Sequence, residues 1–418
     1  MKHKTIWIFN HHATDMAFQH GGRHYYFAKY LIAHGYKVII FCASSSHGQN
    51  KQAVDLNGQL SLEQSVDGIP FVFVKTRSYA GNGAKRVLSM LDYYFNVKKA
   101  VKKYDVPDVI IGSSVHPLAC VAAINLSKRY KCKNIVEIRD LWPESIVAYG
   151  IKSPKNPLIK ILYHAERWLY AKADSILFTF KGGRDYIIEK KWDKEQGGPI
   201  DLGKIYHINN GVDLDVFDRN VQEKIIKDVD LDNPDSFKFV YTGSIRRANN
   251  LDLVLDAAKL VKNPKIQFLI WGDGDQLTRL KQRLKDEQIQ NVIFKGKVGK
   301  HFVPGILHRA DATFFVLENS PLFRFGLSLN KSFEYLAAGK PLLIIGDAAY
   351  SMIDEYKCGY HLRENSPEKF SKSVEQLVGL DSREYQALCE NAREASKKYD
   401  FKVLTDKLIE ILECNSSP

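Results

Sequence analysis

A lysine and a glutamate stand three residues apart in a segment that is otherwise suited to burial, residues 323–342. The segment resembles a glycine-bearing loop that leads into a helix, and Asn330, Lys331 and Glu334 can share the first turn of that helix. Backbone N–H groups at a helix start attract phosphate, and a lysine beside them adds positive charge. A carboxylate one turn further on can accept two hydrogen bonds from a vicinal diol such as a ribose. We therefore expect a nucleotide site here.

The elements that must position these residues form two rounds of alternating strands and helices. The first round has predicted strands at residues 5–9, 37–42, 109–111, 134–138 and 175–178. The second round restarts near residue 237, with predicted strands at residues 237–241, 266–271, 292–294, 312–316 and 342–345. The alternation predicts an α/β fold made of two Rossmann-like, doubly wound domains that face a central cleft. Ligands of such sheets bind at the carboxyl ends of the strands.

The turn-rich segment 205–213 marks a hinge between the two rounds. We place an N-terminal Rossmann-like domain at residues 1–203 and a C-terminal Rossmann-like domain at residues 204–385. Helical periodicity at 383–398 and 401–412 predicts C-terminal helices over the remaining residues, 386–418.

Composition limits the class of protein. The chain has 418 residues with 45% hydrophobic and 26% charged, which is typical of a soluble protein of two domains. No 18-residue apolar run and no secretory leader is recognised, so we expect a cytoplasmic protein. The six cysteines are scattered, which predicts neither a zinc site nor a disulfide framework. The formal net charge of +12 favours an anionic partner.

One acidic motif allows two interpretations. The D-x-D of Asp273-Gly274-Asp275 could hold a divalent metal through oxygen ligands. The simpler interpretation is a turn from strand to helix, with Asp275 capping a helix that starts at Gln276. No G-x-G-x-x-G follows the first strand and no P-loop motif occurs, so dehydrogenase and P-loop functions lack support.

Several motifs, taken in order, resemble those of family 4 retaining glycosyltransferases with the GT-B architecture, over most of the chain. The segment 209–213 resembles the family's interdomain element, and Glu334 with Gly339-Lys340-Pro341 resembles its nucleotide-site motif. The segment 139–145, RDLWPES, resembles a signature of a bacterial branch that assembles capsules, O-antigens and exopolysaccharides. The other matches are Gly21-Gly22-Arg23, Gly272-Asp273-Gly274, Gly296 and Ala310-Asp311. The resemblance implies that the last helix packs back on the N-terminal domain.

The resemblance implies that the domain at residues 1–203 binds the acceptor and that the domain at residues 204–385 binds the nucleotide sugar, with two departures from the family. Gly326 stands eight residues before Glu334, where the family usually has a glutamate. Ser244 and Asn249 stand where the family has an arginine and a lysine, and we infer that Arg246, Arg247 and Lys331 supply the missing charge. The predicted donor-binding residues are Gly21, Gly22, Gly243, Arg246, Arg247, Gly272, Lys297, Asn330, Lys331 and Glu334.

The implied chemistry is cleavage of the bond between an anomeric carbon and a nucleotide diphosphate. Retention is ascribed in the family to front-face attack, in which the leaving phosphate helps to deprotonate the incoming hydroxyl, so we expect no metal and no other cofactor. Arg139 or Asp140 replaces the family's histidine. Asp140 and Glu144 could orient the donor sugar or the acceptor. His116, after the strand at 109–111, could reach the cleft.

These residues also have structural explanations. Lys331 and Glu334 could be solvated charges on a helix surface. Asp140 could cap a helix that starts near Pro143, and His116 could be a loop histidine bonded to backbone. Tight turns alone could explain the glycines, and adjacent arginines cannot easily face the same way.

The excess of positive charge is concentrated at residues 85–103, where basic residues border an apolar and aromatic stripe. Such a helix can lie on an anionic membrane surface, where a lipid-linked acceptor would be found. The alternative is a core helix with solvated lysines. Nucleic-acid binding is less favoured, because no recognised binding module accompanies the charge. The stripe consists of Val87, Met90, Leu91, Tyr94, Phe95 and Val97.

The sequence and the resemblance together predict a retaining glycosyltransferase, with hexose or N-acetylhexosamine specificity, at the inner face of the plasma membrane. The expected donor is a nucleotide diphosphate sugar, for which UDP is favoured, and the expected acceptor is a hydroxyl of a lipid-linked glycan. Two alternatives remain at this point: a UDP-sugar 2-epimerase on the same fold, and a catalytically silent nucleotide-sugar-binding module.

Overall fold

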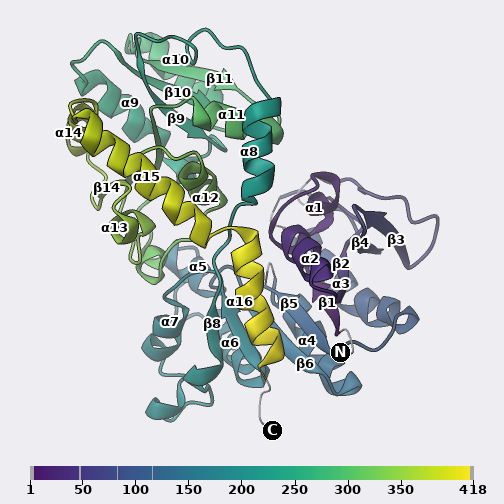
Figure 1. Ribbon diagram of the computed structural model, residues 1–418. Coiled ribbons are helices and arrows are strands. Elements are labelled where there is room, and N and C mark those ends of the chain that lie inside the picture. The colour runs from purple at the N-terminus through teal and green to yellow at the C-terminus, as the bar shows by residue number, and fades with distance from the viewer. Residues whose placement is uncertain (1–3, 47–48, 82, 115, 415–418) are drawn as a thin grey trace. The chain divides into compact units, whose positions relative to one another are not determined.

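The computed structural model describes residues 4–46, 49–81, 83–114 and 116–414 and divides into two compact units (Figure 1). The first unit contains residues 1–209 together with 401–418, and the second contains residues 210–400. The chain therefore changes unit between Asn209 and Asn210 and again between Asp400 and Phe401.

The first unit is built on a sheet with the strand order β3-β4-β2-β1-β5-β6-β7-β8. β3 pairs antiparallel with β4, and the other described strand pairs are parallel. The strands are β1 (Thr5–Phe9), β2 (Lys37–Ala43), β3 (Ser61–Val66), β4 (Ile69–Val74), β5 (Val109–Ser113), β6 (Lys133–Ile138), β7 (Ser175–Phe178) and β8 (Ile205–His207). The helices are α1 (Thr14–Phe18), α2 (Arg23–Ala33), α3 (Ala84–Ala100), α4 (Pro117–Tyr130), α5 (Glu144–Ala148), α6 (Pro157–Lys172), α7 (Gly183–Glu189) and α16 (Phe401–Glu413).

Helices cover both faces of this sheet, which explains why β1 is apolar along its whole length. Ile6 and Ile8 pack in one cluster with residues of α2 and α16, while Trp7 and Phe9 pack in another with residues of α3 and α4. The last helix, α16, thus belongs to the first unit, and the ring of Phe401 stacks on Tyr26 with centroids 4.9 Å apart. This confirms the expected return of the last helix to the N-terminal domain.

The second unit has the strand order β11-β10-β9-β12-β13-β14, and its described pairs are all parallel. Its strands are β9 (Phe237–Thr242), β10 (Ile266–Trp271), β11 (Val292–Gly296), β12 (Ala312–Val316), β13 (Leu342–Ile345) and β14 (Gly359–Leu362). Its helices are α8 (Leu214–Glu223), α9 (Leu251–Leu260), α10 (Leu277–Asp286), α11 (Val303–His308), α12 (Asn330–Ala337), α13 (Met352–Tyr356), α14 (Pro367–Val378) and α15 (Ser382–Lys398). The predicted α/β class with two Rossmann-like units is confirmed.

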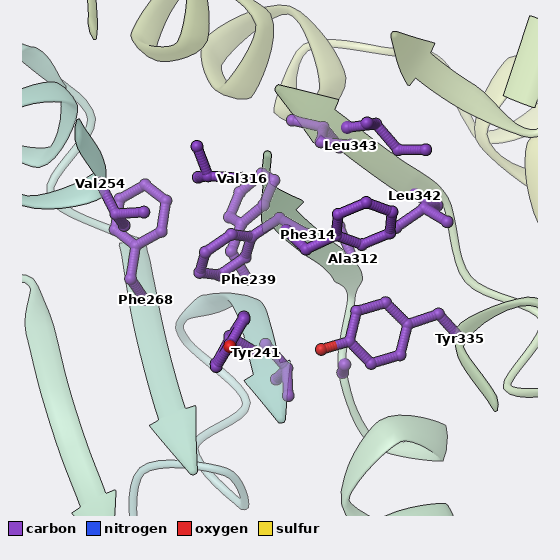
Figure 2. Packing of buried hydrophobic residues seen from close by; sticks show 14 of the residues in the cluster. Phe239, Tyr241, Val254, Phe268, Ala312, Phe314, Val316, Tyr335, Leu342 and Leu343 are labelled. Atoms are coloured by element: carbon purple, nitrogen blue, oxygen red, sulfur yellow. The ribbon is translucent and has the colours of Figure 1, made fainter. Parts of the chain in front are cut away.

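Aromatic side chains fill the centre of the second unit. Figure 2 shows Phe239, Phe268 and Phe314 close together. The ring centroids of Phe239 and Phe268 are 5.5 Å apart, and those of Phe268 and Phe314 are 5.8 Å apart. Tyr335 of α12 points its hydroxyl into the same region as Tyr241 of β9. This packing fixes α12 against the end of β9, where the predicted nucleotide site lies.

Candidate functional site

The strand order of the second unit places a ligand crevice at the carboxyl ends of β9 and β12. The sheet is wound outward in opposite directions from these two strands, and ligands of open parallel sheets bind at such a switch point. α12 is fastened there through Tyr335, whose hydroxyl accepts a hydrogen bond from Thr242 N at 2.7 Å and donates one to Thr242 O at 3.1 Å. Because Thr242 ends β9, the helix face that carries Lys331 and Glu334 is held at this edge of the sheet.

Lys331 lies one helical turn before Tyr335 and is half-buried. Its Nζ donates to Asn249 Oδ1 at 2.9 Å and to the Tyr241 hydroxyl at 3.2 Å. It also lies 4.6 Å from the centroid of the Tyr241 ring. Within the described residues no carboxylate pairs with it, and burial lowers the pKa of Lys331 to about 8. No described carboxylate balances the positive charge of this ammonium group. An anion bound here would therefore interact favourably with it.

Glu334, on the same turn of α12 as Lys331, provides a carboxylate that can accept hydrogen bonds. Its side chain is half-buried, and across the described chain its carboxylate forms neither a hydrogen bond nor an ion pair. Burial raises the pKa of Glu334, and the positive charge of Lys300 opposes that rise. A carboxylate removed from water and left without donors is suited to accept hydrogen bonds from a ligand hydroxyl pair. Asn330, the first residue of α12, is exposed beside it.

The loops after β9 and β11 supply further positive charge. Arg246, Arg247 and Lys297 are exposed, and they have no hydrogen-bonding or ion-pair partner among the side chains that the structure describes. Gly243 is already engaged, because its N–H donates to Trp271 O at 3.0 Å. A Cβ on Gly272 would lie 1.8 Å from Gly243 O, so only glycine allows the loops after β9 and β10 to approach this closely. These two predicted residues therefore shape the loops through their backbones.

Sequence reasoning did not assign roles in the site to Tyr241, Asn249 or Tyr335. Asn249 Nδ2 donates to Ser244 O at 2.9 Å, so the amide links the loop after β9 to Lys331. The position of Tyr335 could have been predicted, because it follows Lys331 by four residues and therefore lies on the same face of the helix. The contact between Asn249 and Lys331 joins residues 82 positions apart and had no local signal.

The acidic motif after β10 is a turn. Asp273 Oδ1 accepts a hydrogen bond from Gly274 N at 2.8 Å. α10 begins at Leu277 with Gln276 at its N-cap and no side-chain cap, so the prediction that Asp275 caps this helix is wrong. The reason is that the helix starts one residue later than expected, which leaves Asp275 outside the capping position. No group of three or more potential metal ligands occurs among the described residues.

In the first unit, the glycine loop before α2 is largely engaged in the turn. Gly22 occupies the N-cap position of α2 with φ 105°, a conformation that side chains other than glycine rarely adopt. The N–H of Gly21 donates to Met16 O at 3.2 Å. Gly21 and Gly22 are both predicted donor-binding residues, and the backbone N–H of Gly21 is thus already used within the protein.

Arg23, the next residue, anchors a buried charge cluster that the sequence did not reveal. Its Nε donates to Glu137 Oε2 at 2.7 Å, and its Nη1 donates to Asn209 O at 2.5 Å. His24 Nε2 lies 3.0 Å from the other oxygen of Glu137. The neighbouring Arg23 and His24 hold the pKa of Glu137 well below its usual range, although burial opposes this. These hydrogen bonds connect the start of α2 to β6 and to Asn209, the last residue before the chain enters the second unit.

The segment after β6 carries three of the predicted catalytic residues. Arg139 and Asp140 have side chains with no hydrogen bond or ion pair to any residue that the structure describes. The alternative in which Asp140 caps a helix is wrong, because α5 begins at Glu144 and its N-cap is Pro143. Glu144 is engaged: its Oε2 accepts from the Tyr163 hydroxyl and from Lys190 Nζ, each at 2.5 Å.

His116 lies at the N-cap of α4 and is only 3% exposed. Its ring meets that of His11 edge-on, with centroids 4.7 Å apart. Neither ring nitrogen has a hydrogen-bond partner in the described structure, so the backbone-bonded alternative is wrong. Burial, helped by His11 and Arg86, holds the pKa of His116 well below its usual range. His116 is therefore a neutral imidazole at the carboxyl edge of the sheet, next to β1 and β5.

The predicted surface helix is α3, and its outer face differs in part from the expected stripe. Val87, Leu91 and Phe95 are exposed as expected, and Leu88 joins them. Val97 is instead fully buried with Tyr93 against the sheet. The helix therefore has an apolar side in the core and a second apolar side facing outward.

Comparisons with known proteins agree on one class. Residues 23–216 match the family Glycosyltransferase Family 4, and residues 222–398 match the family Glycosyl transferases group 1. The chain is similar to "Probable glycosyltransferase WbjE" of Pseudomonas aeruginosa, with 24% identity over 282 residues, 66% of this chain and 67% of WbjE.

Solved structures with the same fold include HepE of Anabaena in complex with UDP-glucose. The TM-score is 0.64, with 13% identity over 98% of this chain and 99% of HepE. WaaG, a glycosyltransferase involved in lipopolysaccharide biosynthesis, gives a TM-score of 0.63, with 14% identity over 98% of this chain and all of WaaG. Such structural neighbours are GT-B glycosyltransferases, and at these identities they establish the fold.

Proposed function

This chain is a two-domain glycosyltransferase that joins a family 4 domain to a group 1 domain, and from that premise we propose that it transfers a sugar from a UDP-activated donor to a hydroxyl of a lipid-linked glycan. The donor sugar is of the N-acetylhexosamine type, its anomeric configuration is retained, and the product enters a surface polysaccharide. Support comes from the UDP-glucose complex of HepE, from the role of WaaG in lipopolysaccharide biosynthesis and from the RDLWPES segment.

The observation that carries this proposal is the pairing of Lys331 and Glu334 on α12. Within one helical turn, a partly desolvated cation and a carboxylate without donors stand at the switch point of the sheet. In the proposed complex Glu334 accepts hydrogen bonds from the ribose hydroxyls, and the ammonium group of Lys331 meets the diphosphate. Arg246, Arg247 and Lys297 add exposed charge for the phosphates.

The proposed reaction needs stabilisation of the leaving group more than a protein nucleophile. The bond between the anomeric carbon and the β-phosphate oxygen breaks while the acceptor oxygen bonds to the same face of that carbon, and the acceptor proton passes to the leaving phosphate. Cations held before the reaction stabilise the charge that develops on this phosphate. We propose that no resident metal takes part, and unchanged turnover in excess EDTA is the expected result.

Groups of the first unit are proposed to serve the sugar and the acceptor. Arg139 and Asp140 have unengaged side chains and are available for a substrate. Neutral His116 can donate or accept a hydrogen bond at the edge of the sheet, because neither ring nitrogen has a partner among the described residues. Glu144, held by Lys190 and Tyr163, is proposed to position the segment that carries Asp140.

The protein is proposed to work in the cytoplasm against the inner face of the plasma membrane. Within the part of the chain that the structure describes, no helix is both long enough and apolar enough to span a bilayer. The outward apolar side of α3, bordered by lysines, is the surface proposed for peripheral contact.

The test is a thermal-shift panel of UDP, GDP, dTDP and their sugars, measured on wild type, E334Q and the control E223Q. Glu223 is an exposed carboxylate of the same unit. We expect UDP compounds to raise the unfolding midpoint of wild type and E223Q, and E334Q to lose most of the shift. If no nucleotide shifts the midpoint, or E334Q responds like E223Q, the donor site is not on α12.

Turnover separates the proposal from its rivals. Incubation with a UDP-sugar alone should leave the sugar unchanged, and addition of membrane-extracted lipid-linked glycan should release UDP. Isomerisation of the sugar without acceptor would instead identify a 2-epimerase, and nucleotide binding without any turnover would identify a silent binding module.

A further inference from the structure

The outer face of α6 is apolar although the helix already buries its opposite face. Leu158, Ile161, Ala165 and Trp168 follow one another at spacings of three, four and three residues and so share a face. Their exposed fractions are 57% for Leu158, 64% for Ile161 and 38% for Trp168. The opposite face, with Ile159, Leu169 and Tyr170, is buried. A helix that is apolar on both sides needs a second partner to cover it.

The charge around this face has one sign. Between residues 145 and 172 the chain has five lysines and arginines, and its single acidic residue is Glu166. Glu166 points inward, where it accepts hydrogen bonds from the hydroxyls of Tyr170 at 2.7 Å and Tyr186 at 2.8 Å. The cations are Lys152 and Lys155 before α6, and Lys160, Arg167 and Lys172 within it. Lys155, Lys160 and Lys172 are exposed and form no ion pair with the described residues.

We propose that this face of α6, with its border of lysines, docks on an anionic lipid bilayer. The apolar stripe would enter the interfacial region, Trp168 would lie at its boundary, and the lysines would meet lipid phosphates. The complementarity of a cationic border with an anionic surface favours a bilayer over a second copy of this chain, whose α6 would present the same positive charge. The inference rests on the proposed function, since a lipid-linked acceptor brings the enzyme to a membrane.

α6 and α3 can serve one docking surface, because α4 packs against both helices. The exposed residues of α3, among them Val87 at 54% and Phe95 at 56%, would then contact the bilayer together with α6. Binding of an interfacial helix grows with the apolar area that it buries and with its attraction to anionic lipids, so both helices would contribute to docking.

Vesicle sedimentation tests the proposal with the full chain and no substrate. The probes are phosphatidylcholine vesicles with and without 30% phosphatidylglycerol, a composition chosen for the assay. We expect wild type to bind the anionic vesicles, L158S/I161S to bind on the order of tenfold less, and K155Q/K160Q to lose much of its preference for anionic lipid. The matched control I225S/V229S removes two exposed apolar side chains of the second unit, 67% and 84% exposed, and should bind like wild type.

Several outcomes would overturn the proposal. L158S/I161S that binds vesicles as well as wild type would remove α6 from the membrane surface, and V87S/F95S would then show whether α3 acts alone. A dimer in light scattering that only the α6 variant abolishes would identify a second copy as the partner. Both double variants should keep the thermal shift with UDP, so a failure of the donor site would be seen separately from a failure of membrane docking.

Discussion

Lys331 should make donor binding depend on pH in the range just above neutrality. Burial lowers the pKa of its ammonium group to about 8 in the unliganded protein, from a usual value of 10.5. A bound diphosphate favours the charged form, so it should return the pKa of Lys331 towards its usual value. Binding therefore takes up a proton when the pH exceeds about 8, and affinity falls as the pH rises.

The size of this effect follows from the two pKa values. At pH 7 about nine tenths of the unliganded protein carries charged Lys331, whereas at pH 9 about one tenth does. If the liganded pKa is at or above about 10, the Kd for a UDP-sugar should rise about tenfold between pH 7 and pH 9, which equals about 1.4 kcal/mol.

Isothermal titration at both pH values measures this directly, and two variants give the reference. K331M should bind more weakly at pH 7 and lose the rise in Kd, while any titration of the ligand itself remains in that variant. K372Q, which removes an exposed lysine of the same unit, should keep the full tenfold effect. A wild-type Kd that changes less than twofold, or an undiminished slope in K331M, would refute the assigned role of Lys331.

Three further perturbations test the surroundings of the site and the first unit. Y335F should reduce the unfolding free energy by about 1–3 kcal/mol in denaturant titration, because it leaves the buried N–H of Thr242 without its acceptor; a neutral result would show that the hydroxyl does not fasten α12. G272A should destabilise the second unit and weaken UDP binding, since its Cβ would overlap Gly243 O, and a wild-type melting curve would contradict the loop packing. Burial raises the pKa of Glu166 to about 8, so between about pH 5 and pH 8 the carboxyl group is protonated in the folded state and ionised in the unfolded state. The unfolding free energy therefore falls as the pH rises through this range, and E166Q should reduce the slope by about 1.4 kcal/mol per pH unit. An unchanged slope would contradict a protonated Glu166.

Most of the sheet could be predicted because its strands are buried on both faces. Continuous apolar runs such as residues 5–9 and 266–271 are confirmed as β1 and β10 with those bounds. The β3–β4 hairpin was missed, although Asp67-Gly68 between alternating segments is a hairpin signal, because the polar edge strand β3 lacks the apolar run of the core strands. β8 was taken as part of the hinge, because its three residues are too few for a period.

For the candidate site, local and distant contacts differ in the same way. The common position of Asn330, Lys331 and Glu334 on one helical turn could be predicted from their spacing, and the helix does begin at Asn330. The partners of Lys331 in three dimensions, Tyr241 and Asn249, come from the loop and strand of another βα unit, and no local pattern joins them. The buried cluster of Arg23 and Glu137 was missed for the same reason, since its members lie 114 positions apart.

The central claim is that α12 holds the nucleotide of the donor, and a crystal structure of the protein with a UDP-sugar tests it most directly. We predict that both ribose hydroxyls lie within hydrogen-bonding distance of the Glu334 carboxylate and that a phosphate oxygen contacts Lys331 Nζ. A UDP-sugar bound with its ribose away from Glu334, or bound only in the cavity of about 490 Å³ that Gln52, Asp55 and Lys75 help to line in the first unit, would contradict the claim.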